Sequence, residues 1–446
     1  MESKREGMQF VIDRENANKW LATLIQELRQ NEKDKVDMMF KLFPPAVDEN
    51  SAENNNTYPV VKKSEINLHP PVEALMNAIL QDSEINMFFH QIFRQQQELS
   101  DNKENPIWCW QIMILLFDMI MTRAPNFNRN GMYVFPIYVA LSSPMATKAG
   151  FAAFRNNKVN KLFKGILNYW GEFLCSPAST YVLNDDEHSG WFGKDAMEVM
   201  PNFAEEFECD SSKLHYGFTS WDGFFARKYR EGIRPVEAPD DNSVVVNACE
   251  SEPFKIAYDV KQRDLFWIKS QYYSLDHMLN DDELAKKFYG GTVYQAYLTA
   301  FNYHRWHSPV SGYVVKTELV DGSYYSQTHH LPSDATMTQY QGYLCHVAAR
   351  GIIYIKADNP DVGLMVFISV GMAEVSSNEI TVKVGDHVKK GDEIGTFHFG
   401  GSSYCLVFQP WVKIMFDIHA DTSRGSNTLS SIPVKSKIAV VSKEEM

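Results

Sequence analysis

Residues 397–404 read Phe-His-Phe-Gly-Gly-Ser-Ser-Tyr, and they lie near the end of a chain of 446 residues. A Gly-Gly-Ser-Ser run by itself is typical of a turn or a flexible linker. Here aromatic residues precede it, and the apolar run 404–408 follows it. A linker between hydrophobic segments is unexpected, because buried backbone groups must find hydrogen-bond partners. A Gly-Ser peptide held rigidly inside a fold has one known chemical use, since the serine hydroxyl can attack the preceding carbonyl.

A second motif lies upstream, where residues 303–312 read Tyr-His-Arg-Trp-His-Ser-Pro-Val-Ser-Gly. It places His304 and His307 just before a Pro and a Gly that indicate a turn. Histidine suits proton transfer near neutral pH. Taken alone, the pair is equally compatible with a metal site and with surface polarity.

Together the two motifs resemble those of the phosphatidylserine decarboxylase family, whose members make their own pyruvoyl cofactor. Residues 221–227, followed by Arg234-Pro235, are similar to the family's Phe-Phe-x-Arg…Arg-Pro segment. Residues 269–275 are similar to its Lys-Gly-x-x-Tyr-Ser-Leu segment. The resemblance covers roughly residues 215–440, with the motifs in the family's order.

The resemblance implies that the Ser402 hydroxyl attacks the carbonyl of Gly401 and that the chain is cut between these residues. Ser402 then becomes an N-terminal pyruvoyl group with loss of ammonia. This carbonyl forms an imine with the substrate amine and takes up the electrons that CO2 leaves behind. The pieces 1–401 and 402–446 are expected to stay associated. Gly400 and Ser403 are expected to support the site, Ser403 through a hydrogen bond.

The resemblance also assigns roles to the titratable residues. His307 is the expected base for Ser402, and His304 is expected to bind the substrate or to return a proton to its Cα. In the family an aspartate orients the base, within an Ala-Asp-Gly sequence after a strand; here residues 248–251 read Ala-Cys-Glu-Ser. Glu250 is therefore the expected acid. A surface glutamate and a structural histidine remain alternatives for Glu250 and His304, and His398 has no partner that the sequence identifies.

The composition restricts partners and location. The formal net charge of −13 argues against nucleic acid and against adhesion to anionic lipid. The six cysteines show no CxxC spacing, so neither a metal site nor a disulfide scaffold is predicted. The N-terminus lacks a signal-peptide pattern, and the most apolar window, 107–121, is too short to span a bilayer and predicts a buried helix. We expect a cytoplasmic protein without integral membrane contact.

The periodicity predicts an α+β fold with a helical N-terminal part and a β-rich catalytic part. We expect three regions: an N-terminal helix and linker (1–60), a helical domain (61–210) and a catalytic domain (211–446). Helical patterns are found at 18–28, 72–80, 85–93, 107–121, 133–141 and 148–173. Strand patterns are found at 244–246, 266–268, 292–298, 313–315, 352–355, 364–370, 380–384 and 406–408. Residues 308–315 and 384–395 resemble the two halves of a lipoyl/biotinyl-type sandwich, here without the lysine context of a carrier domain.

The substrate is less constrained than the reaction. The variant sequence at 248–251, the helical N-terminal part and the Gly-Gly-Ser-Ser form resemble the soluble fungal L-tryptophan decarboxylase branch of the family. We therefore expect a free L-amino acid, aromatic in its side chain, as the substrate. Phosphatidylserine is the first alternative. A non-catalytic relative that serves as a binding or scaffold protein is the second.

Overall fold

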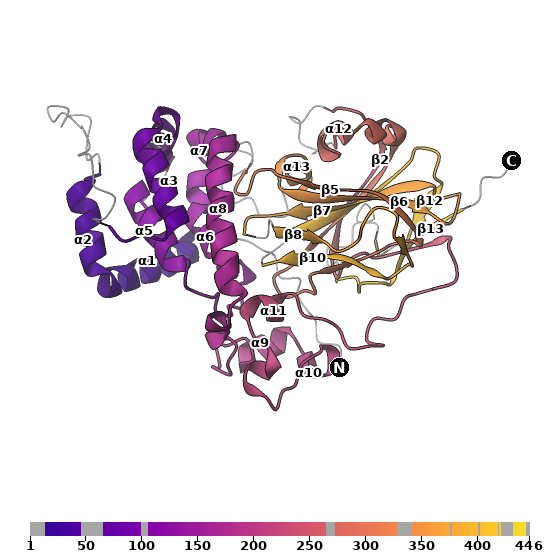
Figure 1. Cartoon of the computed structure of the whole chain (residues 1–446), viewed down its shortest axis with the longest axis horizontal. Coiled ribbons are helices and arrows are strands. Elements are labelled where there is room, and N and C mark those ends of the chain that lie inside the picture. Colours follow the sequence, from indigo (N-terminus) through magenta and orange to yellow (C-terminus); the bar gives the residue numbers. More distant parts are fainter. Residues whose placement is uncertain are drawn as a thin grey trace.

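The computed structural model describes residues 14–45, 66–99, 106–264, 273–327, 341–374, 377–399, 402–417, 419–420 and 431–442. Helices dominate the first half and antiparallel strands the second, so the fold is of the α+β class, as predicted. Figure 1 shows α1–α8 gathered beside the strand layers, with α9–α11 below the junction. No helix in the described part is both long and apolar enough to cross a membrane. The domain limits 60/61 and 210/211 stay predictions.

The helices of the first half follow the predicted apolar patterns. They are α1 (Arg14–Asn31), α2 (Lys33–Leu42), α3 (Pro70–Gln81), α4 (Ser83–Leu99), α5 (Trp110–Ile120), α6 (Pro136–Met145), α7 (Lys148–Ala153) and α8 (Asn157–Leu174), with the 3-10 helix η2 (Gly131–Val134) before α6. All of α5 is buried, as a helix that is apolar on every side requires. Its two polar residues are paired: Asp118 contacts Lys35, and Gln111 donates to the Phe43 carbonyl at 2.9 Å.

One helix prediction was wrong, because the run 148–173 forms two helices and not one. The break falls at Asn156, whose side chain accepts hydrogen bonds from the backbone N–H groups of Lys158 and Val159. Such an N-cap satisfies the free donors at a helix start and favours a new helix over continuation of the old one.

Short helices connect the two halves and decorate the sheets. They are η3 (Pro177–Val182), α9 (Lys194–Val199), α10 (Phe203–Glu206), η4 (Leu214–Gly217), α11 (Trp221–Phe225), α12 (Leu275–Met278), η5 (Glu283–Phe288) and α13 (Gln341–Val347). Ser220 caps α11 by accepting from the Gly223 N–H at 3.0 Å. This cap fixes where α11 begins, and α11 carries side chains that reach the candidate site.

The strands form one large sheet and two small ones. They are β1 (Val244–Val246), β2 (Glu252–Val260), β3 (Gly291–Leu298), β4 (Arg305–His307), β5 (Gly312–Val320), β6 (Arg350–Ala357), β7 (Leu364–Gly371), β8 (Ser377–Ile380), β9 (His387–Val388), β10 (Glu393–His398), β11 (Ser402–Phe408), β12 (Ile414–Phe416) and β13 (Lys437–Val441). The seven-stranded sheet has the order β2-β3-β11-β7-β6-β5-β9, and the small sheets have the orders β1-β13-β12 and β4-β10-β8. All of the described strand pairs are antiparallel.

The apolar strand patterns fall mainly in strands, and the largely buried β3, β6, β7 and β11 fit them well. The prediction at 380–384 was wrong beyond Ile380, where β8 ends, and the pattern at 266–268 lies outside the described residues. Strand β2 was missed because it is an edge strand with half-exposed residues and no clear alternation. The two sandwich-like segments do pair with each other, Gly312 opposite Val388 and Tyr313 opposite His387.

Candidate active site

Ser402 is the first residue of β11, a central strand of the large sheet. Its Cα partners are Leu298 at the end of β3 and Gly371 at the end of β7. The side chain is fully buried, and its hydroxyl has no hydrogen-bond partner among the described residues. A buried hydroxyl without a partner is costly in a folded protein. Gly400 and Gly401 lie outside the described residues.

Two short connections join the large sheet to the β4-β10-β8 sheet next to Ser402. One runs from Leu298 to His304, and the other runs from Phe397 to Ser402. They are tied together, because the Phe397 N–H donates to the His304 carbonyl at 2.9 Å. The backbone of His304 is therefore hydrogen-bonded to β10, the strand that precedes Ser402 in the chain.

The His304 side chain is completely buried. Its ring stacks on Phe225 of α11, with ring centroids 3.8 Å apart and planes 21° from parallel. Neither ring nitrogen makes a hydrogen bond of ordinary geometry to a described residue. Burial lowers the pKa of His304 well below its usual value, and the nearby Arg227 charge lowers it further. His304 is therefore neutral at physiological pH.

His307 is also buried, but both of its ring nitrogens are engaged. Nδ1 lies 2.8 Å from the Gly391 carbonyl, and Nε2 lies 2.9 Å from the Tyr303 hydroxyl. Since a carbonyl can only accept, Nδ1 carries the proton and Nε2 accepts from Tyr303. Burial lowers the pKa of His307 to about 3, and the Lys435 charge contributes. The neutral imidazole thus presents an acceptor nitrogen.

The two histidines point to opposite sides of the chain, because side chains alternate along an extended segment. Phe367 shares a face of the large sheet with Ser402, as the β7–β11 register requires. The Trp306 ring lies 5.4 Å from the Phe367 ring, so Trp306 faces that surface. His304, two residues before Trp306, is turned the same way, and His307 is turned away. The His304 side chain is thus on the side of the segment that carries Trp306, and the His307 side chain is on the other.

The expected contact between Glu250 and His307 is replaced by other pairings among the described residues. The Glu250 carboxylate accepts two hydrogen bonds from Arg234, at 2.9 and 3.2 Å, and one from the Val434 N–H at 2.8 Å. The Gly391 carbonyl and the Tyr303 hydroxyl contact the His307 ring in this structure, and the orienting role expected for Glu250 stays a prediction. Through its hydrogen bond from Val434, the Glu250 carboxylate joins the segment 402–446 to the part of the chain before residue 402.

Two residues of the site were quoted in motifs without a role. Arg227 is buried and donates to the carbonyls of Phe301 and Asn302, at 2.7 and 3.2 Å, which fixes the connection before His304. Burial lowers the pKa of Arg227 to about 10, so it stays charged. Gly391 has a φ of +88°, and a Cβ there would lie 2.3 Å from a Val236 methyl carbon. Gly391 can adopt this turn conformation because it has no side chain, and its carbonyl then accepts the hydrogen bond from His307 Nδ1.

His398 has partners that the sequence did not reveal. Its Nδ1 lies 3.0 Å from a carboxylate oxygen of Asp222 on α11, and its Nε2 lies 2.8 Å from Glu379 on β8. The hydrogen bond with Asp222 raises the pKa of His398 to about 9, and Glu379 adds to the effect. His398 is thus an imidazolium held between two carboxylates, three residues before Gly401. We call His398, Asp222 and Glu379 the ionic clamp.

Phe399 follows the clamp in an uncommon backbone conformation. Its φ of 42° lies in the left-handed region, which costs energy for a residue with a Cβ. Aromatic rings from the helical half surround its side chain and hold it there. Their centroids lie 4.5 Å (Trp170), 4.8 Å (Trp221), 6.1 Å (Phe225) and 6.3 Å (Phe135) from that of Phe399.

Ser403 points to the opposite face of β11 from Ser402. Its hydroxyl accepts from Gln295 Nε2 at 3.3 Å, which is the kind of hydrogen bond expected for it. The same nitrogen donates to the Gln341 carbonyl at 3.0 Å, and Tyr273 donates to the other end of Gln295 at 2.6 Å. Among the described residues no cluster of His, Cys, Asp and Glu side chains is arranged to hold a metal ion.

Two family models match the chain. The phosphatidylserine decarboxylase model matches residues 221–428, and a second phosphatidylserine decarboxylase model matches residues 69–200. The first match contains the site and the strands that position it, and the second covers most of the long helices.

Named relatives are similar over most of their length. The decarboxylase iboD of Amanita muscaria is 45% identical over 63% of this chain and 85% of its own. An L-tryptophan decarboxylase of Psilocybe cubensis is 35% identical over 77% of this chain and 81% of its own. A phosphatidylserine decarboxylase proenzyme of Fusobacterium nucleatum is 30% identical over 50% of this chain and 73% of its own.

Proposed function

The chain belongs to the phosphatidylserine decarboxylase family and is a carboxy-lyase, and we propose that it processes itself and decarboxylates a free aromatic L-amino acid. The processing step cuts the peptide bond between Gly401 and Ser402. Ser402 thereby becomes the pyruvoyl group that the reaction needs.

The observation that carries this proposal is the buried and unpartnered hydroxyl of Ser402 at the end of a doubly paired strand. A serine kept only for structure would be expected to hydrogen-bond its hydroxyl or to give way to alanine. The position suits a nucleophile directed at the carbonyl that precedes it. The orphaned hydroxyl also fits the pyruvoyl group, which forms from this residue.

The processing conserves atoms without a further reactant except water. Ser402 Oγ bonds to the Gly401 carbonyl carbon, and the amide becomes an ester. Elimination across Ser402 releases Gly401 as a carboxylate and leaves dehydroalanine, which takes up water and loses ammonia. A proton must leave the hydroxyl at the first step, and a neutral imidazole can take it. By resemblance that base is His307, whose Nε2 accepts from the Tyr303 hydroxyl in the uncut chain, so Tyr303 must release this nitrogen before it takes the proton.

The two pieces would remain one folded unit. The segment 402–446 contributes β11 to the middle of the large sheet and β12 and β13 to a small sheet. Strand β11 pairs with both of its neighbours along its full length, and Glu250 binds the Val434 N–H. The pyruvoyl carbonyl, conjugated with an amide, supplies an electron sink for loss of CO2. By resemblance, His304 is the residue that returns a proton to the substrate Cα.

The similarity to the L-tryptophan decarboxylases of Psilocybe cubensis and Psilocybe cyanescens supports a free amino acid as substrate. Phosphatidylserine stays the alternative, because two proenzymes named for it are 30% identical over 50% and 54% of this chain. Activity on a dissolved amino acid without detergent or vesicles favours the first. A cytoplasmic location accompanies that proposal.

Intact-protein mass spectrometry under denaturing conditions tests the processing. We expect two species divided between residues 401 and 402, the smaller one lighter than its sequence by the change from serine to pyruvoyl. One full-length species that persists on long incubation would contradict the proposal and favour a binding or scaffold role. A screen of free L-amino acids, with phosphatidylserine vesicles in parallel, then measures CO2 release and decides the substrate class.

A further inference from the structure

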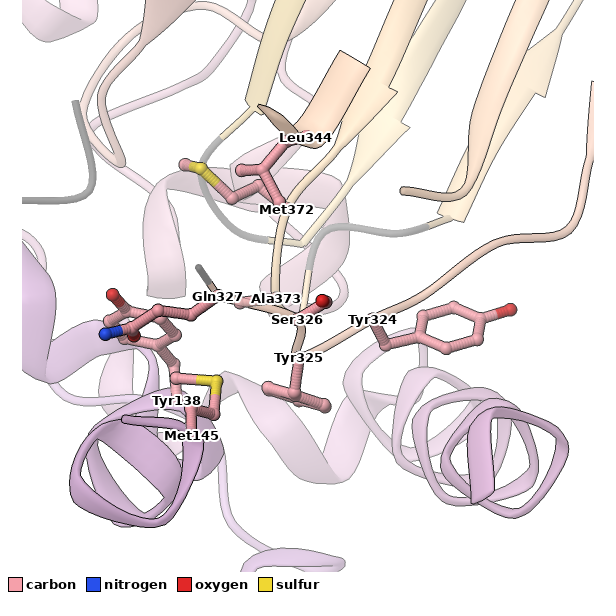
Figure 2. Close-up of a pocket in the computed structure, with 9 residues that line it drawn as sticks. All are labelled: Tyr138, Met145, Tyr324, Tyr325, Ser326, Gln327, Leu344, Met372 and Ala373. Carbon is pink, nitrogen blue, oxygen red and sulfur yellow. The ribbon is translucent and has the colours of Figure 1, made fainter. Parts of the chain in front are cut away.

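A large hollow lies in the helical half, between α1, α5 and the segment 123–136. Water can reach about 350 Å³ of it, which lies within the ~300–1,000 Å³ of small-molecule pockets. The pocket drawn in Figure 2 is much smaller, because its side chains leave only about 20 Å³ that water can reach. Such a space holds about one water molecule. Of these two pockets, only the hollow in the helical half has room for an organic ligand.

Aromatic side chains form much of the wall of this hollow. Trp20 of α1 and Tyr133 of η2 both line it, and their ring centroids lie 5.5 Å apart with planes 39° from parallel. Both residues are half-buried, so their rings have area left for a further contact. Phe127 lines the hollow as well. Because aromatic rings pack well on one another in tilted and offset arrangements, this wall favours a planar aromatic ligand.

The one charged side chain among the described residues that line the hollow is that of Arg123. The chain as a whole has a formal net charge of −13, so this positive lining is a local exception. Arg123 Nη1 donates to Glu27 at 2.7 Å, and the guanidinium has further N–H groups in the same plane. Guanidinium groups bind carboxylates through such donors. Arg123 beside an aromatic wall therefore favours a ligand that joins a carboxylate to a ring.

Two points of the wall are connected to the aromatic rings around Phe399. The Arg123 carbonyl accepts a hydrogen bond from Trp170 Nε1 at 2.9 Å, and the Trp170 ring lies 4.5 Å from the Phe399 ring. Pro136 also lines the hollow, and the ring of the preceding residue, Phe135, lies 6.3 Å from that of Phe399. A ligand that holds Arg123 and Pro136 in place therefore restrains the surroundings of Phe399 too.

We infer that this hollow binds a small aromatic carboxylate and that its occupant steadies the conformation of Phe399. The ring contacts Trp20 and Tyr133, and the carboxylate pairs with Arg123. The site is separate from the one at Ser402, since none of the described residues that line the hollow lies in a strand. Free aromatic amino acids belong to this class of ligand, and the amines left by loss of CO2 do not.

The chain offers a matched control for each of two side chains of the site. Trp108 is also a partly exposed tryptophan of the helical half, and it does not line the hollow. Trp108→Ala therefore controls for Trp20→Ala. Arg94 of α4 is paired with a glutamate, as Arg123 is, so Arg94→Gln controls for Arg123→Gln. Arg123→Gln also keeps the test open if Trp20→Ala does not fold.

Calorimetric titration with indole-3-acetate tests the binding, and indole serves as the ring without the carboxylate. Indole-3-acetate has no amine and cannot form an imine, so the full wild-type chain is used as purified, whether or not it has been cut. We expect Trp20→Ala to weaken the binding of both compounds by about fivefold or more. Arg123→Gln should weaken indole-3-acetate by about fivefold or more, and indole by less than about twofold. Glu27→Gln should strengthen indole-3-acetate by about twofold, because it removes a carboxylate that competes for Arg123.

Hydrogen exchange, measured by mass spectrometry, tests the connection to Phe399. Saturating indole-3-acetate should slow exchange of the peptide that contains Phe399 in the wild type and in Trp108→Ala, and not in Trp20→Ala. The site is overturned by a lack of binding at millimolar concentrations, or by equal effects on binding of Trp20→Ala and Trp108→Ala or of Arg123→Gln and Arg94→Gln. Binding with unchanged exchange at Phe399 overturns the connection. None of these results depends on self-cleavage, so they leave the proposed function to its own test.

Discussion

The chain on the two sides of the peptide bond between Gly401 and Ser402 is held by different kinds of interaction. Downstream, β11 is held by backbone ladders on both edges and is buried throughout. Upstream, the ladder between β10 and β8 ends at His398, and side chains hold His398 and Phe399 there: an ionic clamp, and a cage of aromatic rings around a residue with positive φ. The sheet fixes the nucleophile, and side chains, several of them from the helical half, fix the segment before it.

This difference has a consequence for the order of events. Backbone ladders do not depend on the residue types that they join, so β11 should keep its place after the cut. The upstream segment depends on particular side chains, and it stores backbone strain at Phe399 that a cut could relieve. Substitutions on the two sides should therefore affect different measurements.

The largest effect is expected from Ser402→Ala. The hydroxyl has no partner among the described residues, so its loss should change the free energy of unfolding by less than about 1 kcal/mol. Processing and decarboxylation should both be abolished. Mass spectrometry and thermal unfolding measure the two quantities. Ser403→Ala is the matched control, and it should lose one hydrogen bond, about 1 kcal/mol, while still being cut.

The next largest effect separates the two histidines. His307→Ala should slow self-cleavage, and His304→Ala should leave cleavage intact but slow decarboxylation, each by about 10²–10⁴-fold as for lost proton transfer. The measurements are the cleavage rate of freshly made precursor and the CO2 release per pyruvoyl. The reverse pattern would contradict this assignment and exchange the two roles.

A smaller effect is expected where Glu250 joins the two pieces. Glu250→Gln removes the charge partner of Arg234 and weakens the bond to the Val434 N–H. Charged hydrogen bonds of this kind contribute about 1.5–3 kcal/mol, and the partial exposure of the pair reduces the value. We expect a lower unfolding temperature and an otherwise unchanged pH dependence of the cleavage rate. A shift of that pH dependence would support the orienting role of Glu250 for the base.

The smallest effect is expected from the ionic clamp, and it depends on pH. The pKa of His398 is raised to about 9, above its usual value of 6.5, so its stabilisation is complete below pH 6.5 and is lost as pH rises through about 9. Asp222 and Glu379 are the charged groups that face it. We expect the cleavage rate of the wild type to fall above pH 9. The His398→Gln variant should cleave more slowly than the wild type below pH 9, and its rate should not fall above that pH. The stabilisation that protonated His398 contributes should be about 1–2 kcal/mol after solvent screening is taken into account.

His387→Gln is the control for the clamp. His387 lies 2.9 Å from Asp358, on the far edge of the large sheet from β11. The same substitution there should leave the cleavage rate and its pH profile unchanged. An identical response of both variants would show that the clamp acts only on general stability.

The sequence predicted much of the fold wherever apolar spacing was regular, as in α5 and β3. It failed where a local cap or an edge position decided the outcome, as at Asn156 and in β2. It also proposed Ser402, His304 and His307 as site residues, because they stand in motifs whose residue types suit the chemistry. Their roles stay predictions.

By itself, then, the sequence determined the family, the α+β class and the position of the Gly-Ser peptide, all of which depend on local pattern and residue type. Only the tertiary structure decided which side chains meet. The pairing of Glu250 with Arg234, the clamp on His398 and the opposite orientation of the two histidines join residues that are far apart in sequence or depend on strand register. Which side chains lie close together depends on packing and on strand register, and the local order of the residues determines neither of them.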